Sequence, residues 1–99
     1  MAHLFVLDLT YTADLAEIDA LMAAHRDFLA VHYASGVFLA SGRKEPRTGG
    51  VILAQGERTA LEDIVAQDPF TAAGAVAYTV TEFIPTTTAP ELAHLAVTA

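Results

Sequence analysis

Two polar side chains, His25 and Asp68, stand where the surrounding pattern predicts apolar residues. His25 shares a sector of about 120° on a helical wheel with Ile18, Leu21, Met22, Phe28, Leu29 and His32. Asp68 follows Leu61 by seven residues and Ile64 by four, so it continues the inward stripe of a second, shorter helix. The pattern predicts that an imidazole and a carboxylate both point toward the interior.

An imidazole and a carboxylate placed in this way can transfer protons. A buried carboxylate without a partner costs several kcal/mol, so we expect the two groups to pair. The carboxylate would fix the tautomer of the ring and leave the other ring nitrogen as a general base, worth ~10²–10⁴-fold in rate. The alternative is a purely structural pair. The two interpretations differ in whether a polar cavity opens from His25 to solvent.

Further polar residues could assist such a pair. Ser41 or Tyr78 could orient a substrate oxygen. Arg43, Lys44 and Arg47 crowd into one short segment, which either attracts an anionic ligand or forms a solvated hairpin loop.

No metal or cofactor is expected. The chain contains no cysteine, which excludes disulfides, thiolate metal ligands and a cysteine nucleophile. The other histidines fit no common metal motif and are interpreted as structural or solvated: His3, His32 and His94. Asp8 lies in a predicted central strand, where it either lines the pocket or binds a neighbour.

The composition indicates one small domain. Of 99 residues 54% are apolar, above the ~45–50% of an ordinary soluble domain, so some apolar surface is expected to meet another subunit. Five basic and twelve acidic residues give a net charge of −7, which argues against nucleic acid as a partner. No apolar run approaches the ~18–20 residues of a membrane span, and residues 1–3 lack the positive charge of a signal peptide. We expect a cytoplasmic protein with no membrane partner.

Two helices are predicted between apolar strands. The first covers residues 14–36, from a capping box at Asp14 and Glu17 to a stop at Gly36. The second starts at a capping box formed by Thr59 and Glu62, and Pro69 ends it. A tight turn at residues 71–74 follows, and residues 90–97 could form one or two helical turns.

Strands are predicted at residues 3–11, 37–41, 51–55 and 75–84, with a hairpin connection at 43–49. The order strand, helix, strand, strand, helix, strand predicts an α+β fold. It is a ferredoxin-like βαββαβ sandwich, with a four-stranded antiparallel sheet and both helices on one face. Residues 1–85 would form this domain and residues 86–99 a tail. Because the other face also carries apolar residues from every strand, we expect a second copy to cover it, giving a homodimer.

Three motifs resemble the YCII-related (YciI-like) family over roughly residues 3–85. The segment QDPFTAAG at 67–74 is similar to the family's Asp-Pro-Phe…Gly signature, HRDFL at 25–29 to its first-helix histidine, and Gly36…Ala40-Ser41-Gly42 to its glycine turn and strand end. The resemblance implies a ferredoxin-like fold of the dimeric α/β-barrel group. It also implies that His25 and Asp68 meet in one pocket as a catalytic pair.

The chain departs from the family pattern at two positions. Met22 stands where many relatives have an arginine three residues before the histidine, and Arg43 stands where they have a proline. Arg26, Arg43 or Arg47 could replace the missing arginine, and we count Ser41, Gly42 and Arg43 with Tyr78 as candidate substrate-binding residues.

Two functions of different class remain open. The first is a small cofactor-independent enzyme that uses His25 and Asp68 for isomerisation, elimination or hydrolysis of a small organic molecule. The second is a non-catalytic metabolite-binding or accessory protein that uses the same cleft.

Overall fold

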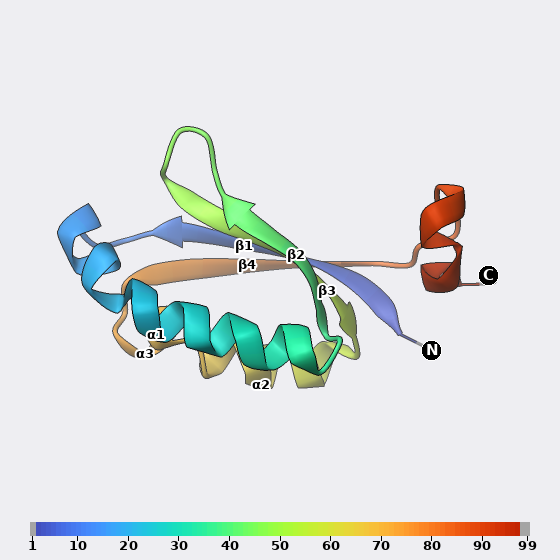
Figure 1. Cartoon of the computed structure of the whole chain (residues 1–99), viewed down its shortest axis with the longest axis horizontal. Helices are drawn as coiled ribbons and strands as arrows, with labels where there is room; N and C mark the ends of the chain where they lie inside the picture. Colours follow the sequence, from blue (N-terminus) through green and yellow to red (C-terminus); the bar gives the residue numbers. More distant parts are fainter. Residues whose placement is uncertain (1, 98–99) are drawn as a thin grey trace.

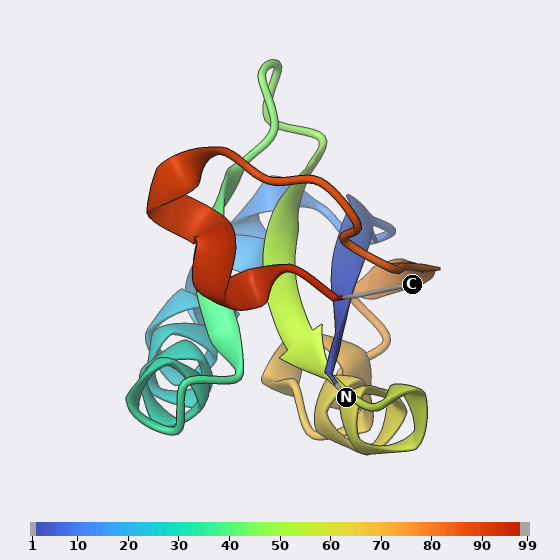
Figure 2. The ribbon, with the colours of Figure 1, turned by 90° about the vertical axis from the view of Figure 1, so that its right-hand side faces the viewer.

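The computed structural model describes residues 2–97, so Met1 and the last two residues of the expected tail lie outside the described part. One antiparallel sheet has the strand order β2-β3-β1-β4. Its strands are β1 (His3–Tyr11), β2 (Phe38–Arg43), β3 (Gly49–Gly56) and β4 (Val76–Phe83). The helices α1 (Leu15–Ala34), α2 (Arg58–Ala66) and α3 (Pro69–Ala72) lie on one face of the sheet (Figures 1 and 2). The predicted ferredoxin-like α+β fold is confirmed, with α3 as an additional short helix.

The core lies between the central strand β1 and the helices. Phe5, Leu7 and Leu9 are at most 2% exposed, and they belong to one apolar cluster with residues of α1, α2 and α3. Side chains of a strand alternate between the two faces, so Leu4, Val6 and Asp8 point the other way. The strand therefore presents its most apolar set to the helices.

The surface opposite the helices also carries apolar side chains, and we call it the helix-free face. Strand pairing places Leu4, Val6, Val51, Leu53 and Phe83 on this face. Val51 and Phe83 are 37% and 40% exposed, which is high for large apolar side chains. Leu4 is buried, but the exposed part of this apolar surface, at Val51 and Phe83, is available to a partner.

The tail contains the short helical segment expected between residues 90 and 97. It is a 3₁₀-helix, η1 (Pro90–Leu95), which lies beyond the end of the sheet where β4 ends (Figure 1). Leu95 is buried, and the Val97 N–H donates to the Pro85 carbonyl over 2.9 Å. The described part of the tail thus folds back on its own chain.

The helix ends follow the predicted signals in part. Asp14 is the N-cap of α1, although its side chain makes no capping hydrogen bond, and Gly36 follows the helix with a φ of 83°. The capping box at Thr59 is wrong, because Glu57 is the N-cap of α2. The strand before it continues to Gly56, whose φ of 148° turns the chain at once into the helix.

The segment after α2 differs from the prediction in a way that matters for the site. Asp68 does not continue the stripe of α2, which ends at Ala66. It is the N-cap of α3, with Pro69 in the first turn and its own side chain accepting from the Phe70 N–H. The expected turn at residues 71–74 is therefore the end of α3 and its exit. Proline is well suited to a first helical turn because its missing N–H has no partner there in any case.

A β-bulge decides which residues of β2 face the helices. Phe38 pairs with Ala54 and Ala40 with Leu53, so Leu39 is the extra residue on its strand. Past the bulge, Ser41 lies opposite Ile52 and therefore on the helix side of the sheet. β2 also extends to Arg43, which the sequence placed in the hairpin loop.

Candidate active site

His25 and Asp68 lie side by side, as predicted. His25 stands in the middle of α1, and its Nδ1 is 2.9 Å from Asp68 Oδ1. Asp68 is fully buried, whereas His25 is 8% exposed. The remaining ring nitrogen, Nε2, has no hydrogen-bond partner among residues 2–97 and keeps a small exposed area. It therefore reaches solvent.

Asp68 accepts hydrogen bonds from three parts of the chain. Besides His25, the Phe70 N–H donates to Oδ1 over 2.9 Å and the Tyr78 hydroxyl donates to Oδ2 over 2.5 Å. An ionised carboxylate only accepts, so His25 must carry its proton on Nδ1. Burial, and then the hydrogen bond to Asp68, raise the pKa of Tyr78 well above its usual value, which keeps this hydroxyl a donor.

Phe70 fixes the plane of the imidazole ring, whose Nδ1 is already held by Asp68. Its ring lies almost parallel to that of His25, with 4.1 Å between the centroids and 14° between the planes. The Asp-Pro-Phe segment thus provides the acceptor for Nδ1 and the surface on which the ring stacks. Because α3 starts directly after Asp68, the side chains of Asp68 and Phe70 both reach the imidazole of His25.

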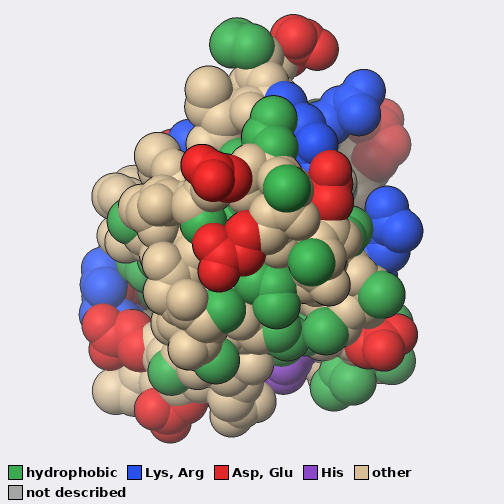
Figure 3. All heavy atoms as spheres, turned by 90° about the vertical axis from the view of Figure 1, so that its left-hand side faces the viewer, with side chains coloured by type: hydrophobic (Ala, Val, Ile, Leu, Met, Phe, Trp, Pro, Cys, Tyr) green, Lys and Arg blue, Asp and Glu red, His purple; other side chains and the backbone are tan. Residues whose placement is uncertain are grey.

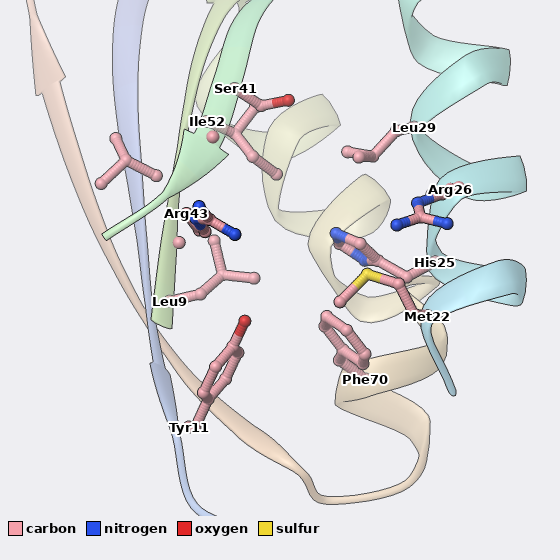
Figure 4. A pocket seen from close by; sticks show the side chains of 13 residues that line it. Leu9, Tyr11, Met22, His25, Arg26, Leu29, Ser41, Arg43, Ile52 and Phe70 are labelled. Atoms are coloured by element: carbon pink, nitrogen blue, oxygen red, sulfur yellow. The ribbon is translucent and has the colours of Figure 1, made fainter. Parts of the chain in front are cut away.

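A small cavity lies beside this pair. Its volume is about 160 Å³, and residues of α1, α3, β1, β2 and β3 line it. The lining residues are Leu9, Tyr11, Met22, His25, Arg26, Leu29, Ser41, Gly42, Arg43, Gly50, Val51, Ile52 and Phe70. Figure 4 shows His25 and Phe70 on one side and the side chains of Leu9, Tyr11 and Arg43 on the other. The cavity thus lies between α1, α3 and the sheet, and no residue of α2 lines it.

The four candidate substrate-binding residues separate into two groups. Ser41, Gly42 and Arg43 line the cavity together with His25. Tyr78 does not line it, because its hydroxyl is directed to Asp68. Tyr78 thus supports the carboxylate from behind, and a contact between any of the four and substrate stays a prediction.

Sequence reasoning did not identify two aromatic residues of the site. Tyr11 lines the cavity from the end of β1, and Phe70 stacks on His25. Tyr11 continues the alternation of Leu7 and Leu9, so the strand pattern already places it on the helix side. Phe70 is in the Asp-Pro-Phe motif, but only the start of α3 at Asp68 reveals where its ring points.

Most basic side chains are neutralised within the chain. Lys44 pairs with Asp8 over 2.6 Å, so Asp8 binds a neighbour and does not line the cavity. Arg47 pairs with Asp19, whose hydrogen bond raises the pKa of the guanidinium. Arg58 pairs with Glu62 and Glu82.

The other histidines have structural or surface positions. His3 lies 2.7 Å from Glu82, and hydrogen bonds from His3 and Arg58 lower the pKa of that carboxyl group. His32 packs against Phe28 and Phe38, and His94 is exposed on η1. Within the described part of the chain, no group of three His, Asp or Glu side chains is placed to hold a metal ion.

These features define a ferredoxin-like protein with a histidine–aspartate pair at a small cavity. The YCII-related domain matches residues 4–84, and the chain belongs to this family. A search of curated proteins finds no match. No helix between residues 2 and 97 has the length and apolarity needed to cross a membrane.

Among solved structures, the chain is similar to 5-chloro-2-hydroxyhydroquinone dehydrochlorinase (TftG) from Burkholderia phenoliruptrix AC1100, in complex with 2,5-dihydroxybenzoquinone. The two share 21% sequence identity with a TM-score of 0.72, over 83% of this chain and 94% of the other. At this identity the likeness establishes a common fold.

Proposed function

We propose that this chain is a small enzyme in which His25 exchanges a proton with an organic molecule bound in the cavity. The observation that carries the proposal is the state of the imidazole. Nδ1 is held by a buried carboxylate, while Nε2 has no partner in the described part of the chain and is accessible from solvent at a cavity. A ring held in one tautomer with its second nitrogen accessible is suited to general acid–base catalysis.

An elimination is the reaction that this arrangement supports best. Nε2 would accept a proton from the substrate, the electron pair of the broken bond would form a double bond, and the leaving group would depart with its own bonding pair. The imidazolium would be stabilised by Asp68 and then return its proton to water. The fold shared with a dehydrochlorinase favours this reaction over isomerisation and hydrolysis. No cofactor enters this scheme.

A non-catalytic role in metabolite binding is the alternative. The lining of the cavity is mainly apolar, with Leu9, Met22, Leu29, Ile52 and Phe70 around a few polar groups, as in many binding sites. Such a cavity would also hold a ligand without converting it. In either role we expect the protein to act in the cytoplasm.

The test uses 5-chloro-2-hydroxyhydroquinone as first substrate and measures chloride release. We expect turnover by the parent protein and a fall in kcat/KM of ~10²–10⁴-fold in His25→Asn. His94→Asn is the control, because that histidine lies exposed on η1 away from the cavity. Circular dichroism should show that both variants are folded.

Two results would count against the proposed function. Turnover that is unchanged in His25→Asn would remove His25 from the chemistry. A compound that raises the Tm of the parent, and less so that of His25→Asn, yet is recovered unconverted would favour the metabolite-binding role, because a ligand of the folded state alone must raise Tm.

A further inference from the structure

Two arginines differ from the other basic residues of the chain. Within residues 2–97, Lys44, Arg47 and Arg58 each have an acidic partner, whereas Arg26 and Arg43 have none within ion-pair distance. Both of these arginines line the cavity. We call Arg26 and Arg43 the arginine pair. Two of the five Lys and Arg residues of a chain with net charge −7 thus stand unpaired at one small site.

The arginine pair comes from two separate elements. Arg26 follows His25 on α1, and Arg43 ends β2, where the bulge at Leu39 turns it toward the helices. Figure 4 shows the two guanidinium groups on opposite sides of the cavity. In Figure 3, Lys and Arg side chains lie near the end of the molecule that carries the β2–β3 hairpin, with Asp and Glu side chains beside them. The unpaired positive charge comes from the arginine pair, on a molecule that is acidic as a whole.

The rest of the lining suits an anion as well. Among the described residues, no aspartate or glutamate lines the cavity. Ser41 accepts a hydrogen bond from the Tyr33 hydroxyl over 2.6 Å, so its own hydroxyl hydrogen remains free to donate to a ligand. Two guanidinium groups and one hydroxyl thus present donors to a space without a competing carboxylate.

The cavity also limits the size of the ligand. Its volume of about 160 Å³ is close to the ~150 Å³ of an engineered apolar cavity that holds benzene. Drug-sized ligands occupy sites of ~300–1,000 Å³, so the part of a ligand that enters this cavity is closer to a single ring in size. Met22, Leu29 and Phe70 offer apolar contacts to a single ring.

We propose that the cavity binds a monocyclic organic acid in its anionic form, with the oxyanion held by Arg26 and Arg43. The inference rests on the proposed function in that it names the substrate class of the same site. A guanidinium donates two parallel hydrogen bonds to a carboxylate, which a neutral group of the same shape cannot accept with equal strength. The arginine pair then selects charged substrates, while His25 performs the proton transfer.

Benzoate is the probe, and benzamide is its neutral counterpart of nearly the same size. Calorimetric titration should show that the parent protein binds benzoate and that added salt weakens the binding. Arg26→Gln and Arg43→Gln should each lower the affinity for benzoate by about tenfold or more and leave the affinity for benzamide unchanged. Arg58→Gln is the matched control, because it removes the same charge from α2 without touching the cavity.

The inference is overturned if the parent protein binds benzamide as tightly as benzoate. It is also overturned if the parent does not bind benzoate at millimolar concentration, or if Arg58→Gln weakens benzoate binding as much as the cavity variants. His25→Asn separates this inference from the proposed function. Arginine-dependent benzoate binding that persists in His25→Asn, in a protein whose turnover does not depend on His25, would keep the anion site and remove the proposed role of His25 in proton transfer. Turnover that depends on His25 but on neither arginine would keep the proposed role of His25 and remove the anion site.

Discussion

At the scale of single residues, the carboxylate of Asp68 accepts three hydrogen bonds, and each has a different structural role. It starts α3 by accepting from Phe70, orients His25 through Nδ1, and receives the hydroxyl of Tyr78 from β4. All of its partners are donors, so the negative charge is stabilised although the side chain is fully buried. The position of the imidazole therefore depends on contacts from two helices and a strand.

Removing the Tyr78 hydroxyl should show how much the hydrogen bond to Asp68 contributes to stability. Tyr78→Phe leaves Asp68 Oδ2 without its donor, and we expect the free energy of unfolding to fall by ~1–3 kcal/mol near neutral pH. Burial and the hydrogen bond to Asp68 raise the pKa of folded Tyr78 above the ordinary value of 10.0. Its stabilising contribution is therefore complete below pH 10 and is lost as the pH rises further, because the unfolded chain ionises first.

Urea unfolding on both sides of pH 10 measures this difference. The gap in stability between the parent and Tyr78→Phe should shrink as the pH rises beyond 10. Tyr33→Phe serves as the control, since its hydroxyl is exposed and, among residues 2–97, bonded to Ser41 alone, and it should change stability little. A gap that stays constant across the pH range would mean that Tyr78 is not held in its protonated form.

The sequence could predict the histidine–aspartate pair but not its full surroundings. His25 interrupts the apolar stripe of α1, and a buried carboxylate requires a partner, so the pairing follows from physical chemistry even though Asp68 lies at the N-cap of α3 and not on a stripe of α2. The role of Tyr78 depends on the register of β4 against the segment that carries Asp68. Alternation along a strand identifies a face, but it does not identify the contact that a side chain makes across the core.

At the scale of elements, helix and strand identities followed from periodicity, whereas boundaries and local irregularities did not. Regular alternation places Phe38, Ala40 and Gly42 on one face of β2. The bulge at Leu39 changes this set to Phe38, Ser41 and Arg43, which is what brings Arg43 to the cavity. A β-bulge inserts one extra residue into a strand and has no firm sequence signal, so the sequence of this segment alone could not predict it.

A glycine at the end of α1 offers a test of element geometry. Gly36 has a φ of 83°, a left-handed conformation that costs other residues roughly 1–2 kcal/mol. We expect Gly36→Ala to lower the free energy of unfolding by about 1 kcal/mol through this strain, since no atom within 4 Å would clash with the new Cβ. Thermal unfolding measures the change.

Gly42→Ala provides the comparison within the same fold. Gly42 has equally open space around it and no left-handed φ, so its change should alter stability by less than ~0.5 kcal/mol. Equal effects of the two substitutions would show that the left-handed conformation at Gly36 does not carry the expected strain.

At the scale of the whole molecule, the helix-free face remains the largest feature without an assigned partner. Leu4, Val6, Val51, Leu53 and Phe83 gather on it, although a sheet with one solvated face normally alternates apolar and polar residues. Its composition favours contact with a second copy of the chain.

We therefore predict a homodimer. Light scattering should give about twice the chain mass of 10.5 kDa. Phe83→Glu places a charge on the helix-free face and should convert the dimer to a folded monomer, whereas Thr79→Glu, which changes an already polar residue, should have less effect. A parent protein that is monomeric at micromolar concentration would contradict the prediction.

The size of the cavity has a consequence for the kinetics of any reaction in it. A space of about 160 Å³ is filled by one ring-sized molecule. We therefore expect the chemistry at His25 to be a rearrangement or cleavage within one molecule, with water as the co-reactant where one is needed. The rate should saturate with a single substrate, and neither an order of addition nor a ping-pong pattern should be seen.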